Sequence, residues 1–162
     1  MTSRTHTARD DLGAAALKGA LAAVAGGLVL KALWEGSARL LPADQQLGSP
    51  TRGAVDRMAA GRGAELTEGQ RAAAAAGVYT AAMATWGALY GVVQTRLHPP
   101  ALAHGLALGA LVYAMNFSGA APLTKQGIAP AFGDQSGPQR AASLGAHAAF
   151  GLATAAAFEA LA

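Results

Sequence analysis

Residues 101–123 read ALAHGLALGALVYAMNFSGAAPL, a stretch without Asp, Glu, Lys or Arg. A helix rises about 1.5 Å per residue, so roughly 20 apolar residues cross the ~30 Å hydrocarbon layer of a membrane. Residues 12–34, 72–93 and 141–161 are similarly long and poor in charge. We therefore predict an all-α fold of one domain, a transmembrane bundle of four helices in up-down order.

The composition of the 162 residues agrees with this prediction. Charged residues make up 13% of the chain, whereas about 25% is typical of soluble domains. The alternative is a soluble alanine-rich bundle, because alanine supplies much of the 52% hydrophobic content. Such a bundle needs polar stripes, which 72–93 and 101–123 lack. The 12 Lys and Arg, against 9 Asp and Glu, are too few and too scattered to indicate nucleic-acid binding.

Residues between the spans predict where helices begin and end. Thr67 and Gln70, like Ser136 and Gln139, have the spacing of a capping box, which starts a helix. Two consecutive prolines at 99–100 predict a very short turn. Short turns join antiparallel neighbours, so we expect the second and third spans to form a tight hairpin.

The two longer loops, 36–71 and 123–140, lie on the same side of a four-span protein, which we call side B. The termini and the turn at 99–100 lie on side A. Side B carries more Lys and Arg, so the positive-inside rule predicts that it is cytoplasmic. Ser49-Pro50 can start a short helix over 51–60, either in the membrane interface or as one turn in a solvated loop. The loop 123–140 is predicted to be a structured turn region or a re-entrant hairpin, with a plain loop as the alternative.

Glycines four residues apart predict how the helices pack. Because the hydrophobic effect does not drive helices together within lipid, close backbone approach must do so. Gly87 and Gly91 in the second span, and Gly105 and Gly109 in the third, have this spacing. We predict that they are helix-packing residues and that the bundle has no wide aqueous pore.

Polar side chains inside the spans are candidate site residues, because an ionisable group in hydrocarbon is unfavourable. Four of them fall toward side B, with Trp34 beside them: Lys31, Glu35, Asn116 and His147. We interpret these four as a candidate ligand-binding or proton-handling group. The alternative is a polar belt, formed by side chains that extend to the membrane surface.

A second group lies toward side A. Lys18 and Glu159 fall at a similar depth on neighbouring helices, so we predict a structural ion pair, with His104 or Gln94 nearby. His104 and His147 start from opposite ends of antiparallel helices, so a haem bound between them is not expected. The chain has no cysteine and no protease, esterase or phosphate-loop motif. We expect no metal, no cofactor and no enzymatic activity.

Short motifs along the chain resemble a known family. They are Lys31-Ala-Leu-Trp34-Glu35, Met115-Asn116-Phe117, Ala121-Pro122-Leu123-Thr124 and Gly145-Ala146-His147, with Glu159 near the end. This layout resembles the YagU-like family of small bacterial inner-membrane proteins of unknown function. The resemblance implies an integral inner-membrane protein with no assigned enzymatic activity, and it implies no catalytic residues.

These observations predict a structural or stress-related component of a bacterial cytoplasmic membrane, surrounded by the lipid bilayer. One alternative is a small transporter or ligand-binding membrane protein that uses the side-B group. Another is an accessory subunit of a larger membrane complex, or a homo-oligomer.

Overall fold

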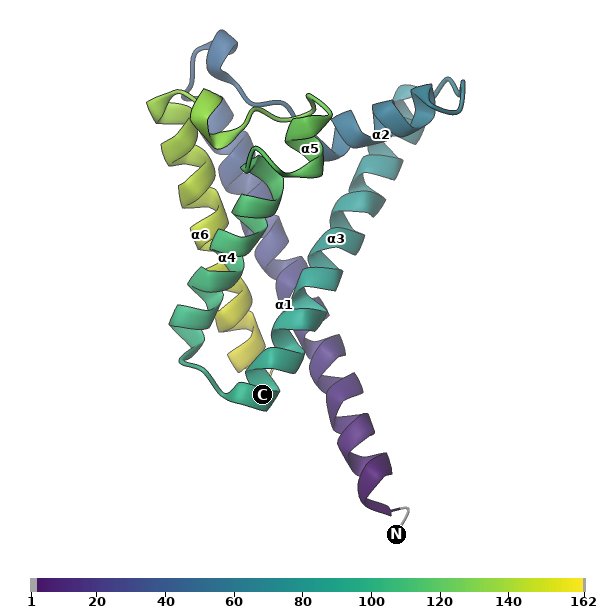
Figure 1. Ribbon diagram of the computed structural model, residues 1–162, viewed down its shortest axis with the longest axis vertical. Coiled ribbons are helices and arrows are strands. Elements are labelled where there is room, and N and C mark those ends of the chain that lie inside the picture. Colours follow the sequence, from purple (N-terminus) through teal and green to yellow (C-terminus); the bar gives the residue numbers. More distant parts are fainter. Residues whose placement is uncertain (1–2, 162) are drawn as a thin grey trace.

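The structure is a computed structural model that describes the backbone of residues 3–161 and the side chains of residues 11–161. Within this range the chain is helical and contains no β-strand. The long helices are α1 (Ser3–Ala38), α3 (Glu68–Leu97), α4 (Ala101–Phe117) and α6 (Gly137–Ala160) (Figure 1). Among the described residues, four segments are long and apolar enough to cross a membrane, when α4 is counted together with the short helix that follows it. The predicted all-α, four-span architecture is confirmed, and the chain is a multi-pass membrane protein.

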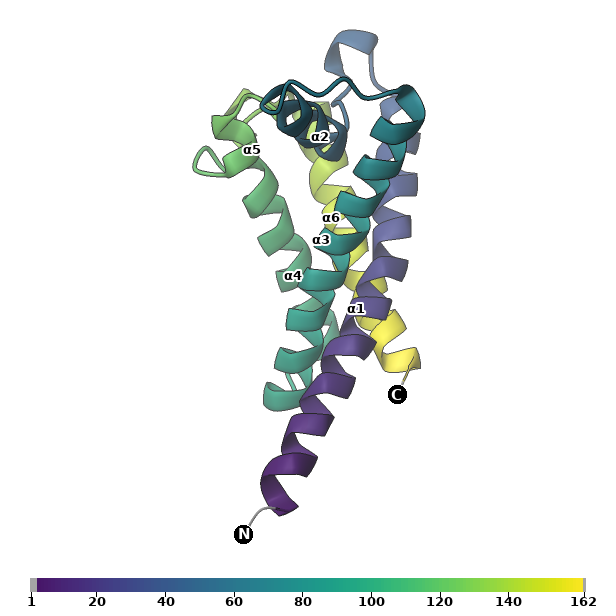
Figure 2. The ribbon, with the colours of Figure 1, turned by 90° about the vertical axis from the view of Figure 1, so that its right-hand side faces the viewer.

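The short elements lie at the side-B end of the bundle: η1 (Ala43–Gln45), α2 (Pro50–Ala60), α5 (Pro122–Lys125) and η2 (Phe132–Asp134). The helix predicted from Ser49-Pro50 is α2, whose Arg52 N–H donates to the Ser49 hydroxyl at 3.4 Å. Because α2 has 11 residues, the alternative of a single turn in a solvated loop is wrong. It lies across the end of the bundle rather than along it (Figures 1 and 2), which is the orientation of an interfacial helix.

Both predicted capping boxes are present. The Thr67 N–H donates to the Gln70 side-chain oxygen at 2.9 Å, and the Gln70 N–H donates to the Thr67 hydroxyl at 3.3 Å. Ser136 and Gln139 make the same reciprocal bonds at the start of α6. Each box pairs two backbone N–H groups that the first helical turn leaves without partners.

Several helix ends differ from the predicted spans, most of all in α1 and α4. α1 extends beyond both ends of 12–34, because helical hydrogen bonding continues into the polar residues on either side. α4 ends at Phe117 rather than continuing to 123. Ser118 is extended (φ −67°, ψ 149°), and Pro122, which has no N–H to donate, starts a separate helix.

The helices are not packed in the order in which they follow one another. α1 packs against both α3 and α6, and α4 packs against α6, but α3 and α4 barely touch. Figure 1 shows α3 and α4 diverging from the turn at Pro99-Pro100 toward side B. The predicted tight hairpin of the second and third spans is therefore wrong. A short turn brings only the two connected helix ends together. Which helices pack along their lengths depends on which helix faces fit one another.

Glycines set the contact between α1 and α3. A Cβ atom at Gly87 would collide with the Gly19 carbonyl oxygen and with the Ala23 side chain. A Cβ atom at Gly91 would collide with the Ala15 carbonyl oxygen. Contact residues four apart on both helices are typical of crossings of about −40° to −50°. Such a steep crossing tilts α3 across α1, which explains why α3 moves away from α4 toward side B.

The other glycine pair sets the contact between α4 and α6. A Cβ atom at Gly105 would lie 2.6 Å from the Gly151 carbonyl oxygen, and one at Gly109 would collide with the His147 carbonyl oxygen. The four glycines that the sequence singles out therefore lie at two helix contacts, and neither contact joins α3 to α4.

The outer surface of the spans carries large apolar side chains. Those at least 44% exposed within the four long helices are Leu17, Leu21, Leu28 and Leu33 on α1, Leu89 and Leu97 on α3, and Leu102, Leu106, Leu111 and Met115 on α4. A soluble bundle needs a polar face at such positions. This surface suits the hydrocarbon of a bilayer, which agrees with the spans identified from length and composition.

Candidate functional site

His147 on α6 is the most deeply buried ionisable side chain of the predicted side-B group, with 3% of its surface exposed. Its Nδ1 lies 2.8 Å from the Ser143 carbonyl oxygen, which can only accept, so Nδ1 carries the hydrogen. In the neutral ring Nε2 is then an acceptor, and the Asn116 amide of α4 donates to it at 3.3 Å. Both ring nitrogens therefore have protein partners, and the second bond joins α4 to α6.

Three aromatic rings surround the imidazole. Its ring centroid lies 6.3 Å from Trp34 on α1, 5.4 Å from Tyr113 and 5.8 Å from Phe117 on α4, each in an edge-on arrangement. Trp34 also stacks on Phe117 at 6.0 Å. We call these four residues and Asn116 the His147 cluster. It joins three of the four spans near side B.

Lys31 and Glu35 lie apart from the His147 cluster. They form an ion pair with each other on α1, where their side chains are 56% and 58% exposed. An exposed pair four residues apart on a helix contributes only about 0.3–0.5 kcal/mol. The structure thus brings together Asn116 and His147 of the predicted side-B group, with Trp34, and leaves the other two as a surface pair.

Sequence reasoning missed two polar residues beside His147. The Ser143 hydroxyl donates to the Gln139 carbonyl oxygen at 2.7 Å. The Gln135 side-chain oxygen lies 3.1 Å from the Ser143 hydroxyl and accepts from the Tyr113 hydroxyl at 3.4 Å. Ser143 could have been found, because it lies one turn before His147 on the same helix face. Gln135 carries no such signal, since it lies in the loop before α6.

On side A, Gln94 links the turn between α3 and α4. Its side-chain N–H donates to the Pro99 carbonyl oxygen at 3.0 Å, and its side-chain oxygen lies 2.6 Å from His104 Nδ1, which donates to it. Tyr90 stacks on His104 with centroids 4.2 Å apart. This contact holds α3 and α4 together at the one end where they meet.

The predicted ion pair between Lys18 and Glu159 does not form among the described residues. The Lys18 ammonium lies 4.1 Å from the centroid of the Phe158 ring instead, in a cation–π arrangement. Glu159 is exposed on the last turn of α6. The two residues share a depth but not a helix face, and depth alone does not bring side chains into contact.

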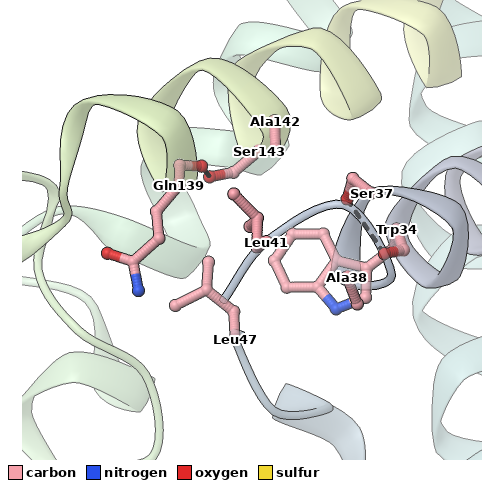
Figure 3. Close-up of a pocket in the computed structure, with 8 residues that line it drawn as sticks. All are labelled: Trp34, Ser37, Ala38, Leu41, Leu47, Gln139, Ala142 and Ser143. Atoms are coloured by element: carbon pink, nitrogen blue, oxygen red, sulfur yellow. Dashed lines mark hydrogen bonds between the residues drawn. The ribbon is translucent and has the colours of Figure 1, made fainter. Parts of the chain in front are cut away.

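A shallow depression of about 10 Å³ lies beside the His147 cluster. It is lined by Trp34, Ser37, Ala38, Leu41, Leu47, Gln139, Ala142 and Ser143. Figure 3 shows Leu41 and Leu47 between Gln139 on one side and Trp34 on the other, with the Ser37 hydroxyl donating to the Trp34 carbonyl oxygen. The depression is therefore lined mostly by apolar side chains and leaves little room for a ligand.

The positions of His104 and His147 determine whether they can hold a cofactor or a metal ion together. His104 and His147 belong to separate clusters near opposite ends of the bundle, so they do not face a common ligand. Among the side chains of residues 11–161, no three His, Asp or Glu groups are placed to hold a metal ion.

Comparison with known proteins does not assign a function to these residues. No protein-family model, curated protein or solved structure matches the chain, so the resemblance to the YagU-like family stays a prediction from its motifs.

Proposed function

We propose that the chain is a structural, non-catalytic protein of a bacterial cytoplasmic membrane. The observation that carries this proposal is the pairing of His147 and Gln94 inside the spans, where the buried hydroxyls of Tyr90 and Thr154 have no partner among the described residues. His147 has a partner at both ring nitrogens, and Gln94 has one at both ends of its amide. Hydrogen bonds between membrane helices contribute about 0.6–2 kcal/mol each. Side chains used in this way act as packing contacts, and the bacterial inner membrane is what the YagU-like resemblance implies.

The layer between the two polar clusters also supports a structural role over transport. It is filled by buried apolar side chains that include Ala22, Val112 and Phe150, each at most 2% exposed. A proton or solute path needs polar groups in series across the membrane. The ionisable and amide side chains here gather near the two ends, and the groups between them include only hydroxyls such as those of Thr85 and Thr154.

Proteoliposomes carrying a pH gradient test this proposal. We expect proton and solute flux equal to that of protein-free liposomes, because the packed apolar layer offers no path. The Asn116→Leu variant should lose about 1 kcal/mol of stability, since it removes one bond between helices, and should leave the flux unchanged. Flux above the protein-free level that disappears in Asn116→Leu would instead establish the transporter alternative.

A second candidate function, that of a subunit in an assembly of membrane helices, is favoured by one face of α3. Ala73, Gly77 and Ala81 are exposed, and a Cβ atom at Gly77 would meet nothing within 4 Å. The outer faces of α1 and α4 carry leucines, which suit lipid, and α3 carries Leu89 and Leu97 further toward side A. The small residues near the start of α3 let another helix approach closely. A second copy related by a twofold axis along the membrane normal presents the same face at the same depth. We therefore propose a homodimer through α3.

Cysteine cross-linking tests the α3 face, because the chain has no cysteine of its own. Gly77→Cys in native membranes is expected to give a disulfide-linked dimer on mild oxidation, and Gly77→Leu should weaken the dimer. Gly145→Cys and Gly145→Leu on α6 are the matched controls, because Gly145 is also exposed with nothing within 4 Å. Equal cross-linking at positions 77 and 145, or none at either, would rule out this dimer.

A further inference from the structure

A cavity of about 420 Å³ lies at the side-B corner where α2 meets the start of α3. Its walls come from three segments: Asp56, Ala59 and Ala60 on α2, Ala64, Glu65 and Leu66 in the following loop, and Arg71 on α3. Figure 1 shows this corner at the end of the bundle, on the opposite side from α6. The volume is in the usual range for small-molecule sites.

Ion pairs between the two helices hold this corner in shape. Arg71 Nε donates to Asp56 at 2.6 Å and its Nη1 donates to Glu68 at 3.2 Å, while Arg52 pairs with Glu68. Val55 on the other face of α2 is 3% exposed, and a Cβ atom at Gly53 would lie 2.7 Å from Ile128. Because α2 is fixed on both sides, the cavity is formed before any ligand arrives.

The walls of the cavity offer both kinds of charge. A guanidinium has five N–H donors, and Arg71 uses two of them in the bonds to Asp56 and Glu68, which leaves three for an anion. Glu65 makes no ion pair with the described residues, and Asp56 uses one carboxylate oxygen, so acceptors remain for a cation. The other wall residues are alanines and a leucine. A ligand that fits has a cationic and an anionic group close together.

The depth of the cavity indicates where such a ligand comes from. α3 has 30 residues and is therefore about 45 Å long, which exceeds the ~30 Å hydrocarbon layer. Its first turn, with Arg71, then reaches the level of the lipid headgroups, which carry phosphates and amines. We propose that the cavity binds the phosphoethanolamine headgroup of a membrane lipid, with the phosphate on Arg71 and the ammonium on Glu65 and Asp56.

The same chemistry predicts selectivity among lipids. A primary ammonium donates three hydrogen bonds to the carboxylates, whereas a trimethylammonium donates none. None of the described residues that line the cavity is aromatic, so cation–π contacts do not compensate a choline headgroup. A phosphoglycerol headgroup has no cation and leaves its net negative charge beside two carboxylates. This inference needs only that α3 spans the membrane, and it is independent of the structural role and of the dimer.

Native mass spectrometry of the full chain, released from nanodiscs with equal amounts of phosphatidylethanolamine, phosphatidylcholine and phosphatidylglycerol, tests the site. We expect preferential retention of phosphatidylethanolamine. Glu65→Gln should reduce that retention about fivefold, as expected for the loss of one charge-assisted bond. Asp134→Asn, which removes the same charge from an exposed residue on the same side, is the matched control and should retain the lipid. Ala60→Trp fills the cavity without changing charge and should abolish retention.

Three outcomes would overturn the proposal. The first is equal retention of the three lipids by the unmodified chain. The second is an equal effect of Glu65→Gln and Asp134→Asn. The third is binding of water-soluble glycerophosphoethanolamine without any preference among the lipids, which would assign the cavity to a soluble zwitterion. Preference for phosphatidylethanolamine that glycerophosphoethanolamine reduces by competition supports recognition of the headgroup.

Discussion

Gly87→Leu is expected to separate α3 from α1 and to lower the free energy of unfolding by about 3 kcal/mol, the upper end of the usual range for overpacking. The reason is that the backbones touch at this position. Any side chain at Gly87 enters the space of the Gly19 carbonyl oxygen and the Ala23 side chain, and a backbone carbonyl cannot turn aside as a flexible side chain can. The helices must move apart, which removes the close contact along their whole crossing.

The measurement is reversible unfolding in detergent, at a protein concentration low enough to dissociate the proposed dimer. Gly77→Leu is the matched control on the same helix, because nothing lies within 4 Å of a Cβ atom there. It should change stability by less than about 0.5 kcal/mol, as surface substitutions usually do. Equal stability of the Gly87→Leu and Gly77→Leu variants would show that α1 and α3 do not meet at Gly87.

Gly109→Leu is expected to have a similarly large effect, again about 3 kcal/mol, at the other helix contact. Its side chain enters the space of the His147 carbonyl oxygen, so α4 must leave α6. That movement also breaks the hydrogen bond from Asn116 to His147. The fluorescence of Trp34 should change with it, because Trp34 contacts both His147 and Phe117.

A double-mutant cycle separates this packing from the hairpin that the short turn predicts. Gly87 and Gly109 lie in different contacts, α1 with α3 and α4 with α6, so their effects should add within about 0.5 kcal/mol. In a hairpin of α3 against α4 the same two glycines would share one contact. A coupling energy well above 1 kcal/mol would therefore contradict the structure.

The sequence alone predicts the helices and most of their ends. Four stretches are long and apolar, and the capping boxes at Thr67 and Ser136 start α3 and α6 where expected. The Ser49-Pro50 pair likewise starts α2. These features are local, because a helix cap or an apolar span depends on residues within a few positions of one another. The end of α4 at Phe117, six residues before the predicted end, is also local, because Ser118 is extended and Pro122 starts a separate helix.

Only part of the candidate site can be predicted from the sequence. Asn116 and His147 lie at a similar depth and form a hydrogen bond. Lys18 and Glu159 also lie at a similar depth, but Lys18 contacts Phe158 instead of Glu159. Helical rise gives the depth of a residue, but contact also requires that both side chains lie on facing sides of their helices. The packing of the whole bundle sets those faces.

The partners of the glycines show most clearly what the tertiary structure decides. Two helix faces on which another helix can pack closely are identified by glycine spacing, Gly87 with Gly91 and Gly105 with Gly109. The spacing does not predict which helix packs there. In the folded chain the first face meets α1 and the second meets α6. The reason is physical: close approach needs a complementary small face, and Gly19 and Gly151 provide it, whereas the short connection at Pro99-Pro100 brings together only the helix ends.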